Sequence, residues 1–262
     1  MPYLSVEKDQ LFYRLESGDP NKVIVFLHSL GTNHQLWKYQ VDKCAAAGYT
    51  VVVPDARGHG KSSCQDGVSV DLWVSDLLAI LNQLQIEKAV LCGVSMGGVQ
   101  AMAFALKHPE RVRALILADT FAKIDPDSVD DKIRFTAGIA KEQGMDRYAD
   151  TYLNNTLAET VSAKEIRGAL RQAIAGMTVE AYTASAEACF RSDVEDQLSK
   201  IAVPALVLIG EEDVKTPIDL SRKITAKIPD AELRIVPRGR HLSNVDEPES
   251  FNQLVFAFLQ AV

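Results

Sequence analysis

Gly93-Val94-Ser95-Met96-Gly97 is the stretch that decides the fold of this chain. An apolar, β-prone run (Lys88–Cys92) precedes it, and a helix-prone run (Gly98–Lys107) follows it. A serine at a sharp turn between a buried strand and a helix has a strained backbone, and glycines two residues to either side let the neighbouring chain pass. The hydroxyl then lies over a helix N-terminus, which favours developing negative charge. We therefore predict that Ser95 is a nucleophile.

Apolar runs alternate with helical patterns on both sides of this motif. Apolar runs predict buried strands at Val23–Leu27, Thr50–Val53, Ala89–Cys92, Val112–Ala118 and Ala205–Ile209, and we expect Ala231–Val236 to be the last strand. Helical patterns lie at Leu36–Ala47, Val70–Leu84, Val194–Lys200 and Pro248–Leu259. The segments Tyr3–Glu7 and Gln10–Ser17 predict an edge hairpin, and Gly18-Asp19-Pro20-Asn21 predicts a turn. This alternation indicates an α/β fold with a mostly parallel central sheet and helices on both faces.

The alternation stops after Asp119. From about Phe121 to Glu187 the pattern is helical, and charged and polar residues are frequent. We expect a core domain of residues 1–120 and 196–262, with a helical cap (lid) of residues 121–195 inserted between strands. Open parallel sheets bind ligands at the C-terminal edge of their strands, so the cap should lie beside that edge.

Composition narrows the classes of function. The net charge of −7 argues against a nucleic-acid partner. The N-terminus lacks a signal-peptide pattern and no run approaches the about 20 apolar residues that span a bilayer, so we expect no membrane partner. Four widely spaced cysteines favour reduced thiols and a cytoplasmic location. The sequence contains no nucleotide-binding loop motif and no cluster of metal-ligand residues, so we expect no cofactor and no metal. No sequence pattern specifies an oligomeric state.

A serine nucleophile needs a base whose pKa is near neutrality, and histidine is the first candidate. His241 follows the last predicted strand, in the chain order that this chemistry requires, so we predict that it is the base. The other histidines lie at the end of the first apolar run and the pocket rim (His28), in a loop (His34), in a Gly-rich turn (His59) and at a helix end (His108).

The imidazole in turn needs a carboxylate that holds its tautomer and stabilises its charge. Asp213 is the leading candidate, because it follows the strand Ala205–Ile209 directly and so lies at the same sheet edge as Ser95. Glu212 in the same turn and Asp119 after the preceding strand are alternatives. The predicted order is nucleophile, acid, base.

An acyl-transfer site also needs donors for the oxyanion. One is expected to be the backbone N–H of Met96, the residue after the nucleophile. The other is expected from the loop His28-Ser29-Leu30-Gly31-Thr32, where Gly31 permits a tight turn that aims the Leu30 N–H inward.

Together, these motifs resemble those of the α/β-hydrolases along essentially the whole chain. The matching pieces are His28–Gly31, Asp55-Ala56-Arg57-Gly58-His59-Gly60-Lys61-Ser62, Gly93–Gly98, Gly210–Asp213 and His241. The resemblance implies the fold and a Ser-His-Asp mechanism but says little about the substrate.

A narrower resemblance is to the β-ketoadipate enol-lactone hydrolases (3-oxoadipate enol-lactonases). It rests on Ser29–Thr32 before Trp37, Gly93–Gly98, Glu187–Phe190 and His241-Leu242-Ser243-Asn244-Val245 before Pro248. It implies hydrolysis of a carboxylate-bearing enol-lactone in the breakdown of aromatic acids. The chain departs from that family in having no tryptophan near Tyr148–Thr156 and in having histidine at position 28, where asparagine is common.

A carboxylate on the substrate calls for a partner in this acidic protein. Candidate cations in the cap are Lys132, Arg134, Arg147, Arg167, Arg171 and Arg191, each of which also fits a solvated helix face. Tyr148 and Tyr152 fit either the pocket or the cap core. Our predicted pocket consists of His28, Trp37, Tyr148, Arg191 and Leu242.

Three functions fit these residues. The first is a serine hydrolase of a small ester or lactone, with the carboxylate-bearing enol-lactone as the leading substrate. The second is a broad short-chain carboxylesterase with the same Ser95, Asp213 and His241. The third is a ligand receptor on this fold with slow hydrolysis.

Overall fold

The computed structural model describes residues 3–262, and at its centre is an eight-stranded sheet in the order β1-β2-β4-β3-β5-β6-β7-β8. The strands are Tyr3–Val6 (β1), Asp9–Glu16 (β2), Asp19–Leu27 (β3), Tyr49–Pro54 (β4), Ala89–Val94 (β5), Val112–Ala118 (β6), Ala205–Gly210 (β7) and Ala231–Val236 (β8). β1 and β4 each pair antiparallel with β2, whereas the neighbours from β4 to β8 pair in parallel. The predicted α/β class with a mostly parallel sheet is confirmed.

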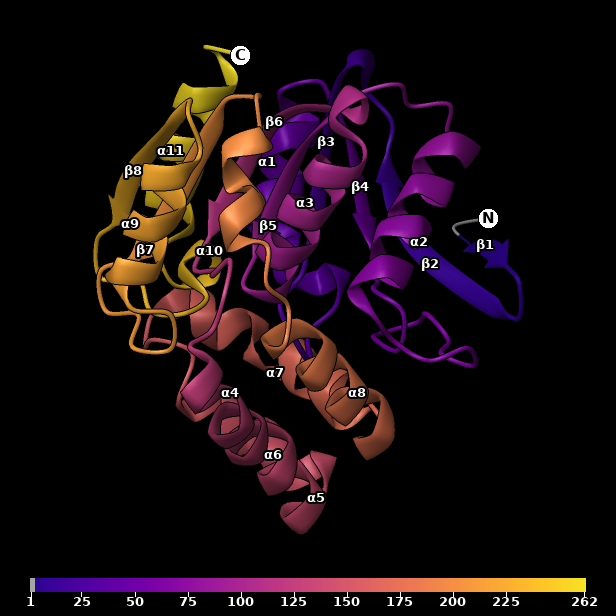
Figure 1. Cartoon of the computed structure of the whole chain (residues 1–262), viewed down its shortest axis with the longest axis vertical. Coiled ribbons are helices and arrows are strands. Elements are labelled where there is room, and N and C mark those ends of the chain that lie inside the picture. Colours follow the sequence, from indigo (N-terminus) through magenta and orange to yellow (C-terminus); the bar gives the residue numbers. More distant parts are fainter. Residues whose placement is uncertain (1–2) are drawn as a thin grey trace.

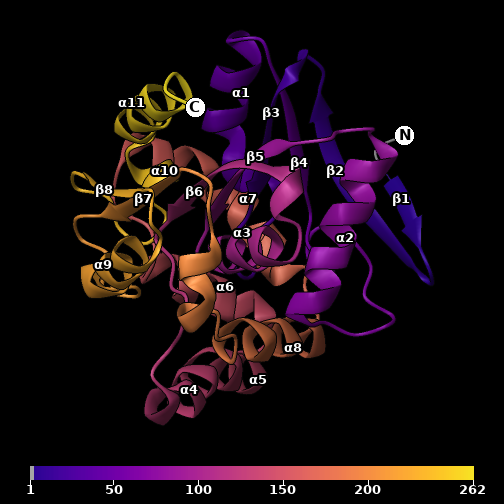
Figure 2. The same ribbon diagram turned by 45° about the horizontal axis from the view of Figure 1, so that its top comes forward.

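Helices cover both faces of the sheet (Figures 1 and 2). The helices outside the long segment between β6 and β7 are η1 (His34–Trp37), α1 (Lys38–Ala46), α2 (Val70–Gln83), α3 (Met96–Lys107), η2 (Pro109–Arg111), α9 (Ile218–Lys227), α10 (Ser243–Asp246) and α11 (Pro248–Leu259). Side chains alternate along β3: Ile24 and Phe26 pack with α1 and α11, while Val25 and Leu27 pack with α2, α3 and α9. A strand buried on both faces must be apolar at every position, which explains the continuous runs in the sequence.

The segment between β6 and β7 is mainly helical. Its elements are α4 (Pro126–Ile133), the π-helical turn η3 (Arg134–Gly138), α5 (Ile139–Gln143), α6 (Met145–Asn154), α7 (Val161–Ala175), α8 (Val179–Phe190) and the 3₁₀ helix η4 (Glu195–Lys200). We call residues 126–190 the helical insertion. Both ribbon views show it gathered at one end of the sheet (Figures 1 and 2). Within it α7 contacts both η1 and α10, so the insertion is anchored on the sheet-bearing part.

Three local elements differ from the expectations. The turn predicted over residues 18–21 is shorter, because Asp19 already pairs with Tyr49 and β3 begins there, with a shift of register before Val23. The helix predicted at Val194–Lys200 is a 3₁₀ helix. Helix α9 was not predicted, because Ser221 and Ile224 are its buried residues and so its apolar pattern is weak.

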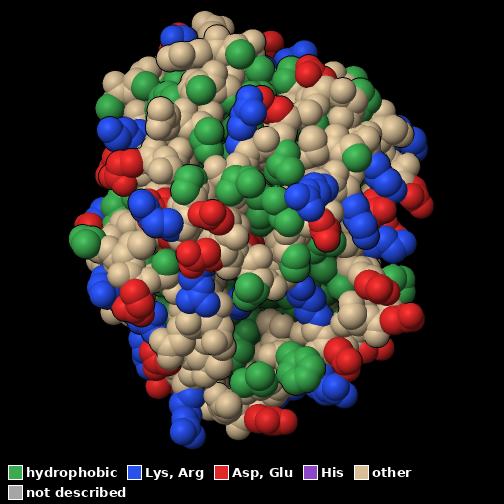
Figure 3. All heavy atoms as spheres, turned by 90° about the vertical axis from the view of Figure 1, so that its left-hand side faces the viewer, with side chains coloured by type: hydrophobic (Ala, Val, Ile, Leu, Met, Phe, Trp, Pro, Cys, Tyr) green, Lys and Arg blue, Asp and Glu red, His purple; other side chains and the backbone are tan. Residues whose placement is uncertain are grey.

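Charged side chains of both signs are mixed on the surface. Figure 3 shows Lys and Arg interspersed with Asp and Glu over the face that it draws. Within residues 3–262, no helix is long and apolar enough to cross a membrane.

The thiols of Cys44, Cys64, Cys92 and Cys189 are free, and all but that of Cys64 are buried.

Candidate active site

Ser95 occupies the turn between β5 and α3 with φ of 56° and ψ of −115°, a left-handed conformation that non-glycine residues seldom adopt. The backbone around it is held by hydrogen bonds: Ser95 N donates to Ala118 O at 3.0 Å, and Thr120 Oγ1 donates to Ser95 O at 2.6 Å. Such strain persists only where the surroundings over-determine it, and it is common at functional sites.

The two glycines of the motif are needed for close packing. A Cβ on Gly93 would overlap the backbone of Gly97, and a Cβ on Gly97 would overlap the carbonyl of Leu27 in β3. The turn therefore packs directly against its own helix and against the neighbouring strand. This explains why glycine occurs at both positions.

Ser95, His241 and Asp213 form a continuous chain of hydrogen bonds. His241 Nε2 lies 3.1 Å from Ser95 Oγ, and His241 Nδ1 lies 2.9 Å from Asp213 Oδ2. With the proton on Nδ1, the ring donates to Asp213 and accepts from the serine hydroxyl. All three side chains are buried. The geometry suits proton transfer from Ser95 to His241.

The loop after β7 holds Asp213 firmly. Asp213 Oδ1 accepts the backbone N–H groups of Lys215 at 2.8 Å and Thr216 at 3.1 Å, and Thr216 Oγ1 donates to Asp213 Oδ2 at 2.5 Å. Burial acts to raise the pKa of Asp213, but the His241 ring and the hydrogen bonds from His241 and Thr216 outweigh it and lower the pKa. The carboxylate is therefore ionised and able to stabilise an imidazolium.

The alternative acids lie elsewhere. Asp119 is buried at the end of β6, where Oδ1 accepts Gly210 N–H at 2.8 Å and Oδ2 accepts Ser243 N–H at 3.1 Å and Ser243 O–H at 2.6 Å. Burial and the nearby charge of Asp213 raise its pKa well above the ordinary range. Asp119 thus ties the start of the Asp213 loop to the segment after His241. The Glu212 side chain is exposed.

Two backbone amides are placed near the nucleophile. Met96 begins α3, and Leu30 lies in the loop after β3, where Gly31 has φ of 81° and Thr32 N donates to Ser29 O at 3.1 Å. Within residues 3–262, neither the Leu30 nor the Met96 N–H has a hydrogen-bond acceptor. Leu30 also lines the cavity at Ser95. These amides are the candidate donors for an oxyanion.

A cavity of about 320 Å³ opens above Ser95 and His241. Its walls come from both the sheet-bearing part and the helical insertion, and they are Leu30, Ser95, Phe121, Lys132, Phe135, Thr136, Tyr152, Phe190, Val214, Lys215, Thr216 and His241. Phe135 and Val214 are 65% and 76% exposed, so they mark its mouth. The size and the mostly apolar walls suit a small organic molecule.

Two lysines face this cavity. Lys132 Nζ donates to the backbone oxygen of Lys215 at 3.0 Å, and Lys215 Nζ lies 4.3 Å from the centre of the Tyr152 ring. Burial lowers the pKa of Lys132, and it lowers the pKa of Lys215 to about 8. Sequence reasoning named Lys132 but missed Lys215, whose one signal was its place two residues after Asp213.

The five residues expected to line the pocket are absent from the described cavity walls. His28 is buried, where Nδ1 donates to Ser29 O and Nε2 accepts Ala56 N–H, both at 2.9 Å. Trp37 stacks on Phe26, and Tyr148 bonds to the Tyr182 hydroxyl. Leu242 is fully buried in the core. These side chains are taken up by packing or by buried hydrogen bonds.

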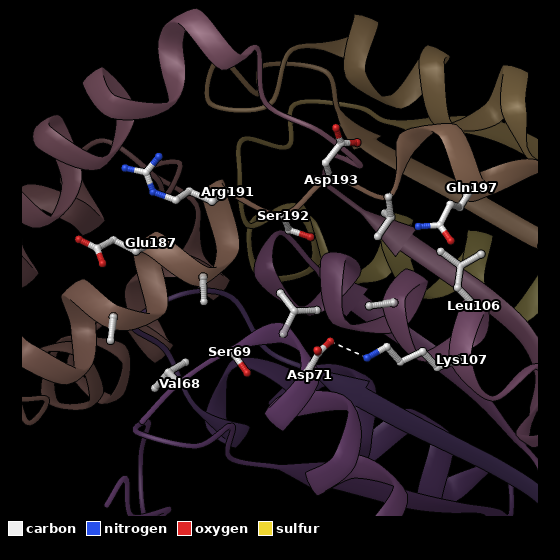
Figure 4. Close-up of a pocket in the computed structure, with 15 residues that line it drawn as sticks. Val68, Ser69, Asp71, Leu106, Lys107, Glu187, Arg191, Ser192, Asp193 and Gln197 are labelled. Atoms are coloured by element: carbon white, nitrogen blue, oxygen red, sulfur yellow. Dashed lines mark hydrogen bonds and ion pairs between the residues drawn. The ribbon is translucent and has the colours of Figure 1, made fainter. Parts of the chain in front are cut away.

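Arg191, the fifth of them, pairs with Asp130 at 2.6 Å. It lines a separate, open groove of about 620 Å³ between α2, α3 and α8, shown in Figure 4. The groove also holds the Asp71–Lys107 ion pair. The remaining arginines of the expected set are exposed or bonded on the surface of the insertion: Arg134 to Asp131, Arg167 to Asn154, Arg171 to Asp146 and Asp150, and Arg147 exposed.

Within residues 3–262, no group of three or more His, Cys, Asp or Glu side chains is arranged to hold a metal ion.

Comparison with known proteins identifies the family of the chain. Residues 22–248 match the profile of the family described as alpha/beta hydrolase fold. The 3-oxoadipate enol-lactonase 2 of Acinetobacter baylyi is 33% identical over 90% of this chain and 88% of its own length. The 2-hydroxy-6-oxononadienedioate/2-hydroxy-6-oxononatrienedioate hydrolase of Burkholderia vietnamiensis is 31% identical over 98% of this chain and 95% of its own. The crystal structure of the enol-lactonase from Burkholderia xenovorans LB400 superposes with a TM-score of 0.89 at 28% identity, over 99% of this chain and 100% of that chain.

Proposed function

This chain belongs to the α/β-hydrolase fold family and is a hydrolase of ester or lactone type, and we propose that Ser95, His241 and Asp213 are its catalytic triad. The observation that carries the proposal is the hydrogen-bond chain from Ser95 Oγ through His241 to Asp213 beside a cavity that Ser95 and His241 line. A buried serine hydroxyl becomes nucleophilic when a neighbouring base accepts its proton.

The first half of the reaction makes an acyl-enzyme. His241 Nε2 takes the Ser95 proton as Oγ attacks the carbonyl carbon, and the oxyanion accepts the N–H groups of Leu30 and Met96. Asp213 stabilises the imidazolium. His241 then gives the proton to the leaving oxygen as the carbon–oxygen bond breaks.

The second half releases the acid. His241 Nε2 takes a proton from water, the hydroxide attacks the acyl carbon, and the proton returns to Ser95 Oγ as the ester bond to the enzyme breaks. In a lactone the leaving oxygen stays tethered to the acyl group. In an enol-lactone that oxygen becomes a ketone, which discourages reclosure of the ring.

We propose a carboxylate-bearing enol-lactone as the substrate. The similarity to enol-lactonases along most of the chain supports this choice. The second candidate is a short-chain carboxylesterase, which the apolar walls Phe121, Phe135 and Phe190 favour because they suit an uncharged acyl chain.

We also propose that residues 121–195 act as a cap on a core of residues 1–120 and 196–262. The cavity walls support this division, since Lys132, Phe135 and Tyr152 from the insertion face Ser95 and His241 from the core. Such a cap excludes water and positions the substrate.

The test compares kcat/KM for 3-oxoadipate enol-lactone and for p-nitrophenyl acetate on one preparation of wild-type enzyme and of Ser95→Ala. A lactone value above ~10⁵ M⁻¹s⁻¹, far above the ester value and lost in the variant, supports the enol-lactonase. Negligible lactone turnover with good ester turnover supports the carboxylesterase. A Ser95→Ala enzyme with most of its activity would overturn the mechanism for both.

A further inference from the structure

The charged side chains described in the walls of the cavity above Ser95 are two lysines. Lys132 and Lys215 are among its walls, and the described walls contain no aspartate or glutamate. The protein as a whole has a net charge of −7, so its long-range field repels anions. The two lysines therefore create a local field of the opposite sign at the place where the substrate binds.

Both ammonium groups are without a carboxylate partner. Within residues 3–262, no carboxylate oxygen lies within 4.0 Å of either Nζ, and their contacts are the Lys215 carbonyl and the rings of Tyr152 and Phe190. Arginines on the outer surface of the insertion differ, because Arg171 and Arg191 each bind an aspartate.

Asp213 is the nearest candidate partner for Lys215, and its oxygens are already engaged. They accept from His241, from Thr216 and from the backbone N–H of Lys215, while the Lys215 side chain points to Tyr152. Partly buried ammonium groups that lack a counter-ion are costly unless something compensates them. An anion in the cavity is such a compensation.

We propose that Lys132 and Lys215 form an anion-binding subsite that holds a carboxylate of the substrate. One oxygen of the carboxylate would accept from each ammonium group, while the scissile carbonyl lies at Ser95. This inference rests on the proposed serine hydrolase and adds which residues select anionic esters and lactones over neutral ones. Because Lys132 lies in the insertion and Lys215 in the loop after β7, the bound carboxylate would also join the two parts.

The first test uses a matched pair of esters, mono-p-nitrophenyl adipate and p-nitrophenyl hexanoate, which share acyl length and differ in the terminal carboxylate. The measured quantity is the ratio of their kcat/KM values, corrected for spontaneous hydrolysis. Wild-type enzyme should prefer the anionic ester. Lys132→Met and Lys215→Met should each lower the ratio roughly 10- to 100-fold, the usual effect of removing a charge-assisted hydrogen bond.

Two further variants control for charge and for packing. Lys141→Gln removes one positive charge from an exposed position of the same insertion and should leave the ratio within about twofold of wild type. Lys215→Arg keeps the charge and should restore much of the preference that Lys215→Met loses.

The second test measures how the same ratio depends on pH, in wild-type enzyme and in Lys215→Arg. An ammonium binds an anion while it is protonated, so the preference should be full at pH 7 and should fall as the pH rises through about 8, the pKa of Lys215. The charged groups that set this pKa after burial are Asp213 of its own loop, Lys132 of α4 and Arg240 after β8. Steps that involve Ser95 and His241 affect both esters and cancel in the ratio. Lys215→Arg should remove the fall.

The outcomes separate this inference from the proposed function. A ratio that is unchanged in both methionine variants and flat with pH overturns the subsite, while the hydrolase mechanism stands. Hydrolysis of the hexanoate ester that survives Ser95→Ala overturns the mechanism itself. If a methionine variant fails to fold, the pH profiles of wild type and Lys215→Arg decide the question.

Discussion

The sheet core and the helical insertion hold their polar groups in different ways. In the core, Asp119 and Asp213 are buried and accept several hydrogen bonds each, and Ser95 and Asp119 have left-handed backbones. In the insertion, arginines form exposed ion pairs, such as Arg191 with Asp130. Buried polar groups are costly to leave unpaired, whereas exposed ion pairs contribute about 0–1 kcal/mol. We therefore expect substitutions at the reacting groups of the core to be strongly disruptive. Substitutions in the insertion should mainly change which substrates the cavity accepts.

The largest effect that tests this comparison is loss of the nucleophile. Ser95→Ala should lower kcat roughly 10⁶-fold, by analogy with measured triads, because the proton acceptor His241 then has no nucleophile to activate. Steady-state kinetics with p-nitrophenyl acetate measure it, and Ser185→Ala, a buried serine of the insertion, is the matched control. Equal losses in the two variants would contradict the assignment.

The second-largest effect concerns the two buried aspartates, whose substitutions should have different consequences for kcat and for stability. Asp213→Asn should cost about 10⁴-fold in kcat, because the amide no longer selects the productive tautomer of His241. Asp119→Asn should cost far less in kcat and should instead lower stability, since its carboxylate binds Gly210 and Ser243 rather than the imidazole. Kinetics and thermal unfolding of both variants measure this. The reverse order would make Asp119 the catalytic acid.

Substitution of a glycine tests how closely the core is packed. Gly97→Ala should lower the free energy of unfolding by about 3 kcal/mol or more, because the new Cβ overlaps the carbonyl of Leu27 in β3. Urea denaturation measures the change. A variant as stable as wild type would show that the turn relaxes more readily than its packing indicates.

Acid should affect the core through its buried histidines. All five histidines lie outside residues 121–195. Burial lowers the pKa of His59 from 6.5 to about 3, so the unfolded chain binds a proton there at a higher pH than the folded protein does. This contribution is fully present above pH 6.5 and is lost as the pH falls toward 3, by at most about 1.4 kcal/mol per pH unit.

The measurement for His59 is the free energy of urea unfolding at several pH values between 7 and 4.5. The free energy of unfolding should fall less steeply with decreasing pH in His59→Gln than in wild type, because the variant lacks the titrating imidazole. Subtracting one curve from the other removes the contribution of the other titrating groups, which both proteins share. Parallel curves would mean that His59 titrates alike in both states.

The smallest effect is expected in the insertion. Gly168 lies inside α7, and a Cβ at that position would meet no atom within 4 Å. Gly168→Ala should therefore raise the free energy of unfolding by roughly 0.5–1 kcal/mol, because alanine loses less backbone entropy in a helix. Urea denaturation beside Gly97→Ala makes the contrast direct. Destabilisation by Gly168→Ala would show that the insertion is packed as tightly as the core.

Much of the fold was readable from local patterns. The run Val112–Ala118 and the helix Pro248–Leu259 have the predicted bounds, because their burial patterns are strong and have clear ends. The strand Ala231–Val236 also has the predicted bounds, although Val236 is the one fully buried residue among its six. Helix α9 and the start of β3 were missed. Their limits depend on which surface they pack against and on pairing with Tyr49, far along the chain.

Some residues of the candidate site were likewise predictable from the sequence, and others were not. The residues Ser95, Asp213 and His241 were predicted because each follows a strand of a parallel sheet, and strand ends meet at one edge. The cavity walls were predicted only in part: Lys132 and Tyr152 were among the candidates and line the cavity. Trp37 and Tyr148 pack elsewhere, while Phe121, Phe190 and Lys215 line the cavity without having been predicted. A helical pattern tells which face of a helix is apolar and leaves open what that face covers.

By itself, then, the sequence determined the class of fold, the order of its strands and helices, and the residues expected at the end of each strand, because these depend on local periodicity and turn chemistry. Only the tertiary structure decided which carboxylate reaches His241, and that Asp119 serves as a tie. It also decided that Lys132 of the insertion and Lys215 of the core face one cavity. These outcomes depend on side chains that are far apart in the sequence and are brought together by packing. Local sequence patterns carry no information about such long-range contacts.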